Sequence, residues 1–198
     1  MRRKKVLFVA LICLGLGAIG VVAGYNGLVR ANEAVNEAWS QVQNVYQRRL
    51  DLIPNLVETV KGYAEHEKST FQAVTEARAK VSRITQNVSA KTLNDPASFQ
   101  KFQEAQEAMG GALGRLLLVA ERYPDLKANE NFLTLQSQLE GTENRIAVER
   151  RRFNEIVRAY NTRIKQFPLN MLSGAFGFAP KAYFEAVKGA ENVPAVKF

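Results

Sequence analysis

The residues that most often carry out catalysis are scarce in this sequence. The only histidine is His66, and the only cysteine is Cys13, which lies inside an apolar stretch and has no partner for a disulfide. A nucleophilic hydrolase needs a serine or cysteine with a base within reach. Spacing alone leaves open only a serine activated by a lysine. We therefore predict no catalytic residue and do not expect an enzyme.

Motifs for metals and cofactors give the same answer. Glu65-His66-Glu67 places its side chains about 100° apart on a helix, and no second histidine exists to complete a zinc site, so a solvated His66 is expected. Glu-x-x-His pairs for a di-iron centre do not occur in the sequence. The glycines from Gly15 to Gly20 match a dinucleotide fingerprint by letter, but no strand–helix–strand unit surrounds them. We predict no metal, no cofactor and no small-molecule substrate.

Three charged residues have unusual positions, because the helical periodicity described below would point them at a core. They are Arg49, Arg78 and Glu149. A charge facing a core is costly unless it is paired, so we expect the three to meet in a buried polar layer. Drift of a helix against a seven-residue pattern could instead carry any of them to the rim. Asparagines near the face of Glu149 could help to fix helix register: Asn144, Asn154 and Asn161.

The run Glu149-Arg150-Arg151-Arg152 suggests binding of an anion or a lipid headgroup, although a solvated helix face explains it more simply. The formal charge of the chain is +8. Four of these charges come from Arg2-Arg3-Lys4-Lys5, which leaves 23 basic and 19 acidic residues, or +4, for the remainder. Basic residues beside a membrane segment determine topology, so nucleic acid is not an expected partner.

The basic cluster precedes a stretch that can cross a membrane. Val6 to Gly24 are nineteen uncharged, mostly apolar residues, which span about 29 Å as a helix. Val21-Val22-Ala23 would also allow signal-peptide cleavage, but the apolar run is longer than usual for one. We predict a retained anchor over residues 1–27, in the inner membrane, with its N-terminus in the cytoplasm and the rest outside. Gly20 and Gly24 form a G-x-x-x-G pair, a candidate contact between membrane helices.

Residues 28–168 have the periodicity of helices. Apolar residues recur at alternating steps of three and four, and no strand pattern competes. The first stripe begins at Leu28 and resumes in register beyond Pro54, where a kink is expected. A second helix should begin at Ser69, which has a capping-box partner in Gln72.

Two further breaks divide the rest of this region. Asp95 suits an N-cap with Pro96 at the first helical position, and Tyr123-Pro124-Asp125 interrupts the chain again before a last helix of about 35 residues. Four stripes cannot each bury a face alone. We predict an all-α fold: an N-terminal transmembrane helix followed by an antiparallel up-and-down four-helix bundle of long helices.

Residues 169–198 differ in character, with glycines and prolines between aromatic residues. We expect this tail to pack on the bundle, on a neighbouring subunit or on the membrane. Its aromatic residues are Phe176, Phe178, Tyr183, Phe184 and Phe198.

Several motifs in fixed order resemble those of the bacterial LemA family. They are Tyr25-Asn26-Gly27-Leu28-Val29, Arg48-Arg49-Leu50-Asp51-Leu52-Ile53-Pro54-Asn55-Leu56-Val57, Tyr123-Pro124-Asp125-Leu126-Lys127-Ala128-Asn129, Thr142-Glu143-Asn144-Arg145-Ile146-Ala147 and Phe153-Asn154-Glu155 through Tyr160-Asn161. The resemblance implies a membrane helix followed by an antiparallel helical bundle, and it supplies no catalytic residues.

Function is expected to reside in surfaces. The sequence favours a membrane-anchored structural or scaffolding protein of the bacterial cell envelope that associates with itself, with the lipid bilayer and another copy as partners. The alternative is an adaptor that regulates a membrane enzyme such as a protease. In either case an envelope protein is a possible partner.

Overall fold

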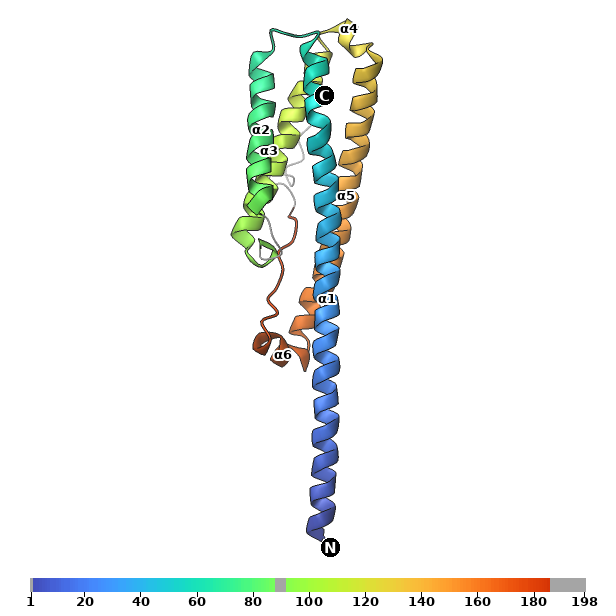
Figure 1. Ribbon diagram of the computed structural model, residues 1–198, viewed down its shortest axis with the longest axis vertical. Coiled ribbons are helices and arrows are strands. Elements are labelled where there is room, and N and C mark those ends of the chain that lie inside the picture. The colour runs from blue at the N-terminus through green and yellow to red at the C-terminus, as the bar shows by residue number, and fades with distance from the viewer. Residues whose placement is uncertain (1, 88–91, 186–198) are drawn as a thin grey trace, which may run out of the picture.

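The computed structural model describes residues 2–87 and 92–185, and every regular element within these ranges is a helix (Figure 1). The all-α prediction is therefore confirmed. The elements in chain order are α1 (Arg2–Lys61), α2 (Lys68–Asn87), the 3-10 helix η1 (Thr92–Asn94), α3 (Pro96–Ala120), α4 (Pro124–Lys127), α5 (Glu130–Lys165) and α6 (Leu169–Ala175).

Helix α1 is a single unbroken helix of 60 residues, or about 90 Å. Its N-terminal part is the one helix among the described residues that is long and apolar enough to cross a membrane, and the apolar window there is not buried within the chain. The helix continues through Pro54 to Lys61. Proline lacks an amide donor, but Ile53 and Leu56 on either side are both buried, so packing holds the turn in place.

Capping residues and prolines predicted the first residues of α2 and α3 to within one residue. The carboxylate of Asp95 accepts a hydrogen bond from the amide of Ala97 at 3.1 Å, and Pro96 opens α3, as predicted. Helix α2 begins at Lys68, one residue before the predicted Ser69.

The break near residue 123 contains a short helix that the periodicity does not indicate. Helix α4 fills it, with Leu126 fully buried. Asn129 then caps α5 by accepting a hydrogen bond from the amide of Phe132 at 3.0 Å. Helix α5 runs for 36 residues, close to the predicted 35.

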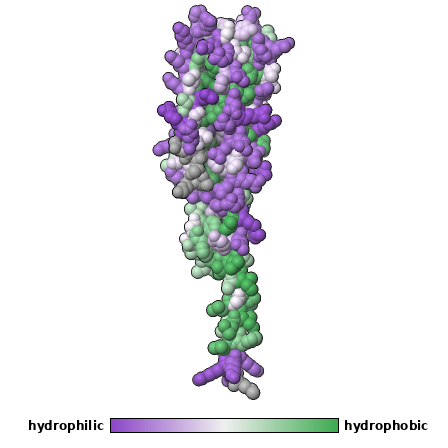
Figure 2. All heavy atoms as spheres, in the orientation of Figure 1, coloured by the Kyte–Doolittle hydropathy of each residue, from purple (hydrophilic) through white to green (hydrophobic). Residues whose placement is uncertain are grey.

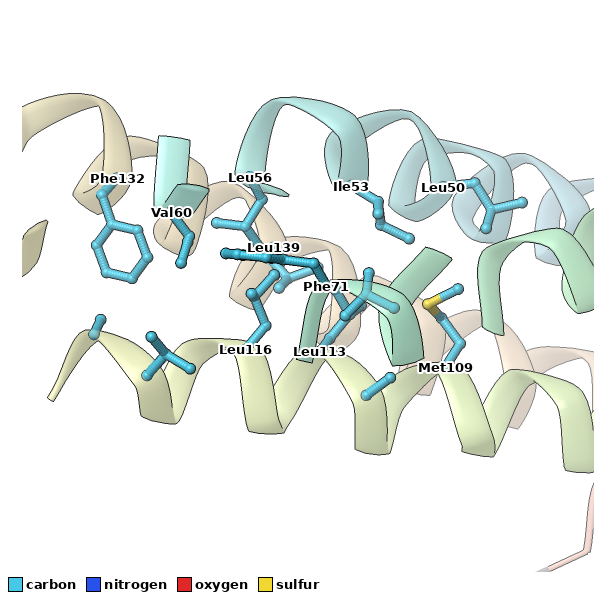
Figure 3. Close-up of a cluster of buried hydrophobic side chains, with 14 of the residues drawn as sticks. Leu50, Ile53, Leu56, Val60, Phe71, Met109, Leu113, Leu116, Phe132 and Leu139 are labelled. Atoms are coloured by element: carbon cyan, nitrogen blue, oxygen red, sulfur yellow. The ribbon is translucent and has the colours of Figure 1, made fainter. Parts of the chain in front are cut away.

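The long helices pack side by side, α1 mainly against α5 and α2 mainly against α3 (Figure 1). We call residues 28–165 the helical body. Its buried side chains form two clusters at successive levels along α1. The aromatic core lies nearer the apolar part of α1 and includes Leu28, Trp39, Phe99, Phe102, Phe153 and Tyr160. The distal core includes Leu50, Ile53, Leu56, Met109, Leu113, Leu116, Phe132 and Leu139 (Figure 3).

Candidate functional site

A polar layer separates the two cores, and Arg49 is its centre. On α1, Arg49 lies between Tyr46 of the aromatic core and Leu50 of the distal core, and only 3 % of its side chain is exposed. Its Nη1 donates to Oε1 of Glu143 at 3.0 Å, and its Nη2 donates to the carbonyl oxygen of Gln106 at 3.2 Å and also to Oε1 of Gln106. The charge is thus paired across α1, α3 and α5, as a buried cation requires.

The polar layer has different members from those predicted. Of the three predicted residues only Arg49 is at its centre, and in the part of the chain described no hydrogen bond or ion pair joins any two of Arg49, Arg78 and Glu149. Arg78 is exposed, and its Nε reaches the carbonyl oxygen of Leu50 at 3.5 Å. Glu149 is half-buried and lies six residues beyond Glu143 along α5. Drift of a helix against a seven-residue pattern moves stripe positions toward the rim, which fits the half-buried Glu149 and the exposed Arg78.

Sequence reasoning missed Gln106 and Glu143. Gln106 had a visible signal, because it is a polar residue interrupting an apolar stripe between Phe102 and Met109. Glu143 had none, since it lies beside the stripe position Thr142 and is 43 % exposed.

A second arrangement holds the segment that follows α6. Residues 178–185, here called the strap, run without regular secondary structure from α6 along the helical body (Figure 1). Two side-chain amides of α5 and one of α3 each bind one strap residue by both its backbone groups. Asn161 binds Lys181 at 2.8 and 2.9 Å, Asn154 binds Phe184 at 2.9 and 2.9 Å, and Gln103 binds Glu185 at 3.2 and 2.8 Å.

These paired hydrogen bonds replace the partners that a helix or sheet would give the strap backbone. The amide of Ala182 adds a bond to the carbonyl of Leu93 at 2.9 Å, and the hydroxyl of Tyr160 donates to the carbonyl of Ala179 at 3.1 Å. Asn154 and Asn161 were expected to fix helix register, and the structure instead shows them holding the strap. Asn144 is exposed.

Phe184 anchors the strap in the aromatic core. Its ring lies 4.9 Å from that of Phe99, 5.5 Å from that of Phe153 and 6.2 Å from that of Trp39, measured between centroids. The guanidinium of Arg150 lies 4.6 Å above the same ring and also donates to the carbonyl of Glu185 at 3.3 Å. One member of the basic run 150–152 therefore secures the strap, while Arg151 and Arg152 are exposed.

Lys181 is an unusual member of the strap because its side chain is buried. Its Nζ lies 5.6 Å from the ring centroid of Tyr160, a cation–π arrangement. Burial lowers the pKa of Lys181, and the nearby Glu33 carboxylate opposes that shift. Burial also raises the pKa of Tyr160.

The two glycines of the candidate membrane-helix contact have different surroundings. A Cβ added at Gly24 would lie 2.8 Å from Cδ2 of Leu169 and 3.2 Å from Cδ1 of Leu172, so Gly24 is a close contact with α6 of the same chain. A Cβ added at Gly20 would meet nothing within 4 Å. Gly27, one turn farther on, similarly makes room for the guanidinium of Arg163. Of the two predicted contact glycines, Gly20 and Gly24, only Gly20 thus has open space beside it.

The described residues contain no group of three side chains able to hold a metal ion, and His66 is exposed in the turn after α1. An open hollow of about 950 Å³ lies between α1 and α5 beside α6. Its lining mixes small and apolar residues with arginines: Ala31, Ala34, Ile156, Arg158, Arg163 and Leu169. Residues 186–198, including Phe198 of the predicted tail, lie outside the described ranges.

Comparison with known proteins confirms the resemblance found in the motifs. The chain is 28% identical to Magnetosome protein MamQ 2 of Paramagnetospirillum magneticum, over 87% of this chain and 68% of that protein. It is equally similar to Magnetosome protein MamQ of Magnetospirillum gryphiswaldense, with the same coverage. It is 25% identical to Protein LemA of Metamycoplasma hominis, over 92% of this chain and 80% of that protein. The sequence profile of the LemA family matches residues 38–198, which is most of the chain. The chain therefore belongs to the LemA family.

Proposed function

We propose that this protein is a membrane-anchored structural or scaffolding protein of the bacterial cell envelope that associates with itself through its membrane helix. The observation that carries the proposal is the unbroken helix α1. One end of it is apolar, exposed within the chain and long enough to cross a bilayer, while the other end contributes to both cores of the helical body. Such a helix would hold a packed helical body at the membrane, which suits a structural role.

In this proposal the helical body is an antiparallel up-and-down four-helix bundle. The support is that α1 packs against α5 and α2 against α3, and that α1, α3 and α5 supply both cores. The N-terminus lies in the cytoplasm and the body outside, because Arg2 to Lys5 precede the apolar stretch, whereas the flank that follows it, residues 25–45, holds only Arg30 against Glu33 and Glu37. Protease added outside an intact inner membrane should digest the body. Protection of the body would reverse this orientation.

Self-association is supported by one face of α1. At about 100° per residue, Cys13, Gly17, Gly20, Gly24 and Gly27 fall within an arc of about 80°. The end of this face at Gly24 and Gly27 is occupied by α6 and Arg163, whereas Gly17 and Gly20 have no neighbour within 4 Å of an added Cβ. Small residues let membrane helices approach closely, so this open part of the face fits a second copy of the helix.

The test is the size of the protein in mild detergent. Gly17→Leu/Gly20→Leu should reduce the assembly to a smaller species, because the larger side chains separate the helices. The matched control is Gly15→Leu/Ala18→Leu on the opposite face, which should keep the wild-type size. A wild-type protein that is monomeric would favour the adaptor that regulates a membrane enzyme, and an assembly unchanged by Gly17→Leu/Gly20→Leu would place the contact elsewhere.

A further inference from the structure

The largest apolar side chains exposed outside the membrane helix include three that lie in or beside α6. Phe167 is 80 % exposed and Met171 69 % exposed, and Phe176 at the C-terminal end of α6 is 51 % exposed. Figure 2 shows the same feature as hydrophobic surface that continues from the apolar part of α1 over the level of α6, below a mainly polar body. An apolar patch of this kind usually marks a binding surface.

The height of α6 along α1 is fixed by direct contacts. Leu169 and Leu172 pack on Gly24, the last residue of the apolar stretch. The ring of Tyr25 lies 5.0 Å from that of Phe176 and 5.9 Å from that of Phe178, between centroids. Because the stretch from Val6 to Gly24 matches the thickness of a bilayer core, a bilayer crossed by this stretch would have α6 level with its boundary between acyl chains and headgroups.

The charges near α6 suit the same boundary. From Ile156 to Phe184 the sequence has no acidic residue and three exposed basic ones, namely Arg158, Arg163 and Lys165, besides the buried Lys181. Arg163 and Lys165 end α5 just before α6, and the guanidinium of Arg163 lies against Gly27, one turn beyond Gly24. Basic side chains at that height can reach lipid phosphates, while aromatic and apolar side chains enter the interface below them.

We infer that residues 167–176 form an interfacial foot, which inserts Phe167, Met171 and Phe176 into the outer boundary of the same bilayer that α1 crosses. This inference rests on the proposed membrane anchor. The foot gives the chain a second, lateral contact with lipid. Because Gly24 lets α6 pack directly on α1, the anchor and the foot form one unit and enter the membrane together.

The experiment uses the full chain in lipid nanodiscs that contain one chain each, with lipids brominated at defined acyl positions as tryptophan quenchers. Single variants Met171→Trp and Phe176→Trp report on the foot. The only native tryptophan, Trp39, is buried in the aromatic core, 15 residues beyond Gly24 or about 22 Å along the helix, so it supplies a background that these lipids do not quench. Leu118→Trp, at the distal end of α3 and 67 % exposed, is the matched control outside the membrane. Leu14→Trp, in the apolar stretch, tests the anchor.

We expect both foot reporters, Met171→Trp and Phe176→Trp, to be quenched more by bromine near the headgroup than by bromine deep in the acyl chain. Leu14→Trp should be quenched mainly by deep bromine. Leu118→Trp should not be quenched. Adding Phe167→Ser to Phe176→Trp should reduce its quenching. If Leu14→Trp is quenched while both foot reporters behave like Leu118→Trp, the foot is refuted and the anchor stands. If Leu14→Trp also escapes quenching, the anchor and the foot fail together. Foot reporters shielded only in larger particles with several chains would show that another copy covers this surface, and this too would overturn the inference.

Discussion

Asn161 of α5 holds Lys181 of the strap by two hydrogen bonds, with its Nδ2 donating to the Lys181 carbonyl at 2.9 Å and its Oδ1 accepting from the Lys181 amide at 2.8 Å. Both residues are buried. The side-chain amide of Asn161 thus satisfies both backbone groups of Lys181, as a neighbouring strand would in a sheet.

Replacing that amide should loosen the strap. Asn161→Leu leaves two buried backbone groups of Lys181 without partners, at a cost of about 2–4 kcal/mol in the free energy of unfolding. The measurement is chemical denaturation in detergent micelles. Asn144→Leu, an exposed asparagine of the same helix, is the control and should change stability little. Equal losses for the two variants would mean that the paired bonds do not stabilise the strap.

The polar layer predicts how much stability is lost when Arg49 or each acidic residue of α5 near it is replaced. Glu143→Ala should destabilise by about 1 kcal/mol, a modest figure because the Glu143 carboxylate is partly solvated and Arg49 keeps its bonds to Gln106. Arg49→Ala should cost about 3 kcal/mol or more, since it removes a buried side chain and leaves Gln106 without its partner. Glu149→Ala should resemble Glu155→Ala, because Oε2 of Glu149 is buried without a hydrogen-bond partner among the described residues, so the substitution removes no hydrogen bond from that atom. Thermal melting of the four variants would check the order, and a larger loss for Glu149→Ala than for Glu143→Ala would contradict it.

Gly24 and Gly20 should respond differently to the same substitution. Gly24→Leu would force apart α1 and the leucines of α6, at a cost of about 1–3 kcal/mol. Gly20→Leu should leave the stability of the single chain unchanged, because nothing lies within 4 Å of its added Cβ. Limited proteolysis of the α6 region would report the difference, with faster cleavage expected only for Gly24→Leu. Similar cleavage of both variants would show that α6 does not depend on Gly24.

Stability should fall at alkaline pH because of Tyr46. Burial raises its pKa above the ordinary 10.0, against the opposing effect of Arg150 and Arg49. The folded state then keeps the phenolic proton after the unfolded chain has lost it, so this stabilisation is complete below pH 10.0 and is lost as the pH rises through the folded pKa. Lys181 acts in the opposite direction, since its lowered pKa makes folding more favourable as the pH approaches its ordinary 10.5.

Denaturation midpoints between pH 8 and about 11 would test this balance. Above pH 10.0 the stability of Tyr46→Phe should decline less than that of the wild type. The stability of Lys181→Met should decline more steeply, because this variant lacks the lysine whose deprotonation favours folding as the pH rises. Tyr183→Phe, on the exposed side of the strap, is the matched control. A wild-type decline that Tyr46→Phe does not alter would assign the alkaline loss to other groups.

Features that depend on neighbouring residues could be predicted from the sequence. The Asp95 cap, the proline at the start of α3, the length of α5 and the apolar stretch of α1 all follow from short-range chemistry or from periodicity. Helix α4 could not be predicted in this way, because four residues carry no period. The partner of Arg49 could not be predicted either, since the choice of Glu143 over Glu149 depends on the rotation and axial position of α5 against α1.

The strap illustrates the same limit more clearly. Its residues have neither helical nor strand periodicity, and its backbone partners come from Asn154, Asn161 and Gln103, which are distant in sequence. An asparagine on a helix face can serve the helix register or a passing segment equally well. Only the three-dimensional arrangement decides between them.

The continuity of α1 has a mechanical consequence. Because α1 is one continuous helix from the apolar stretch to Lys61, a tilt of its N-terminal end would be transmitted to the helical body along a helix of about 90 Å. In a chain anchored as proposed, a change in bilayer thickness that tilts α1 by about 20° would swing the far end of the body sideways by roughly 20 Å, counted over the 37 residues beyond Gly24. The far end, near Pro54 and α4, would therefore move in response to the local thickness of the membrane.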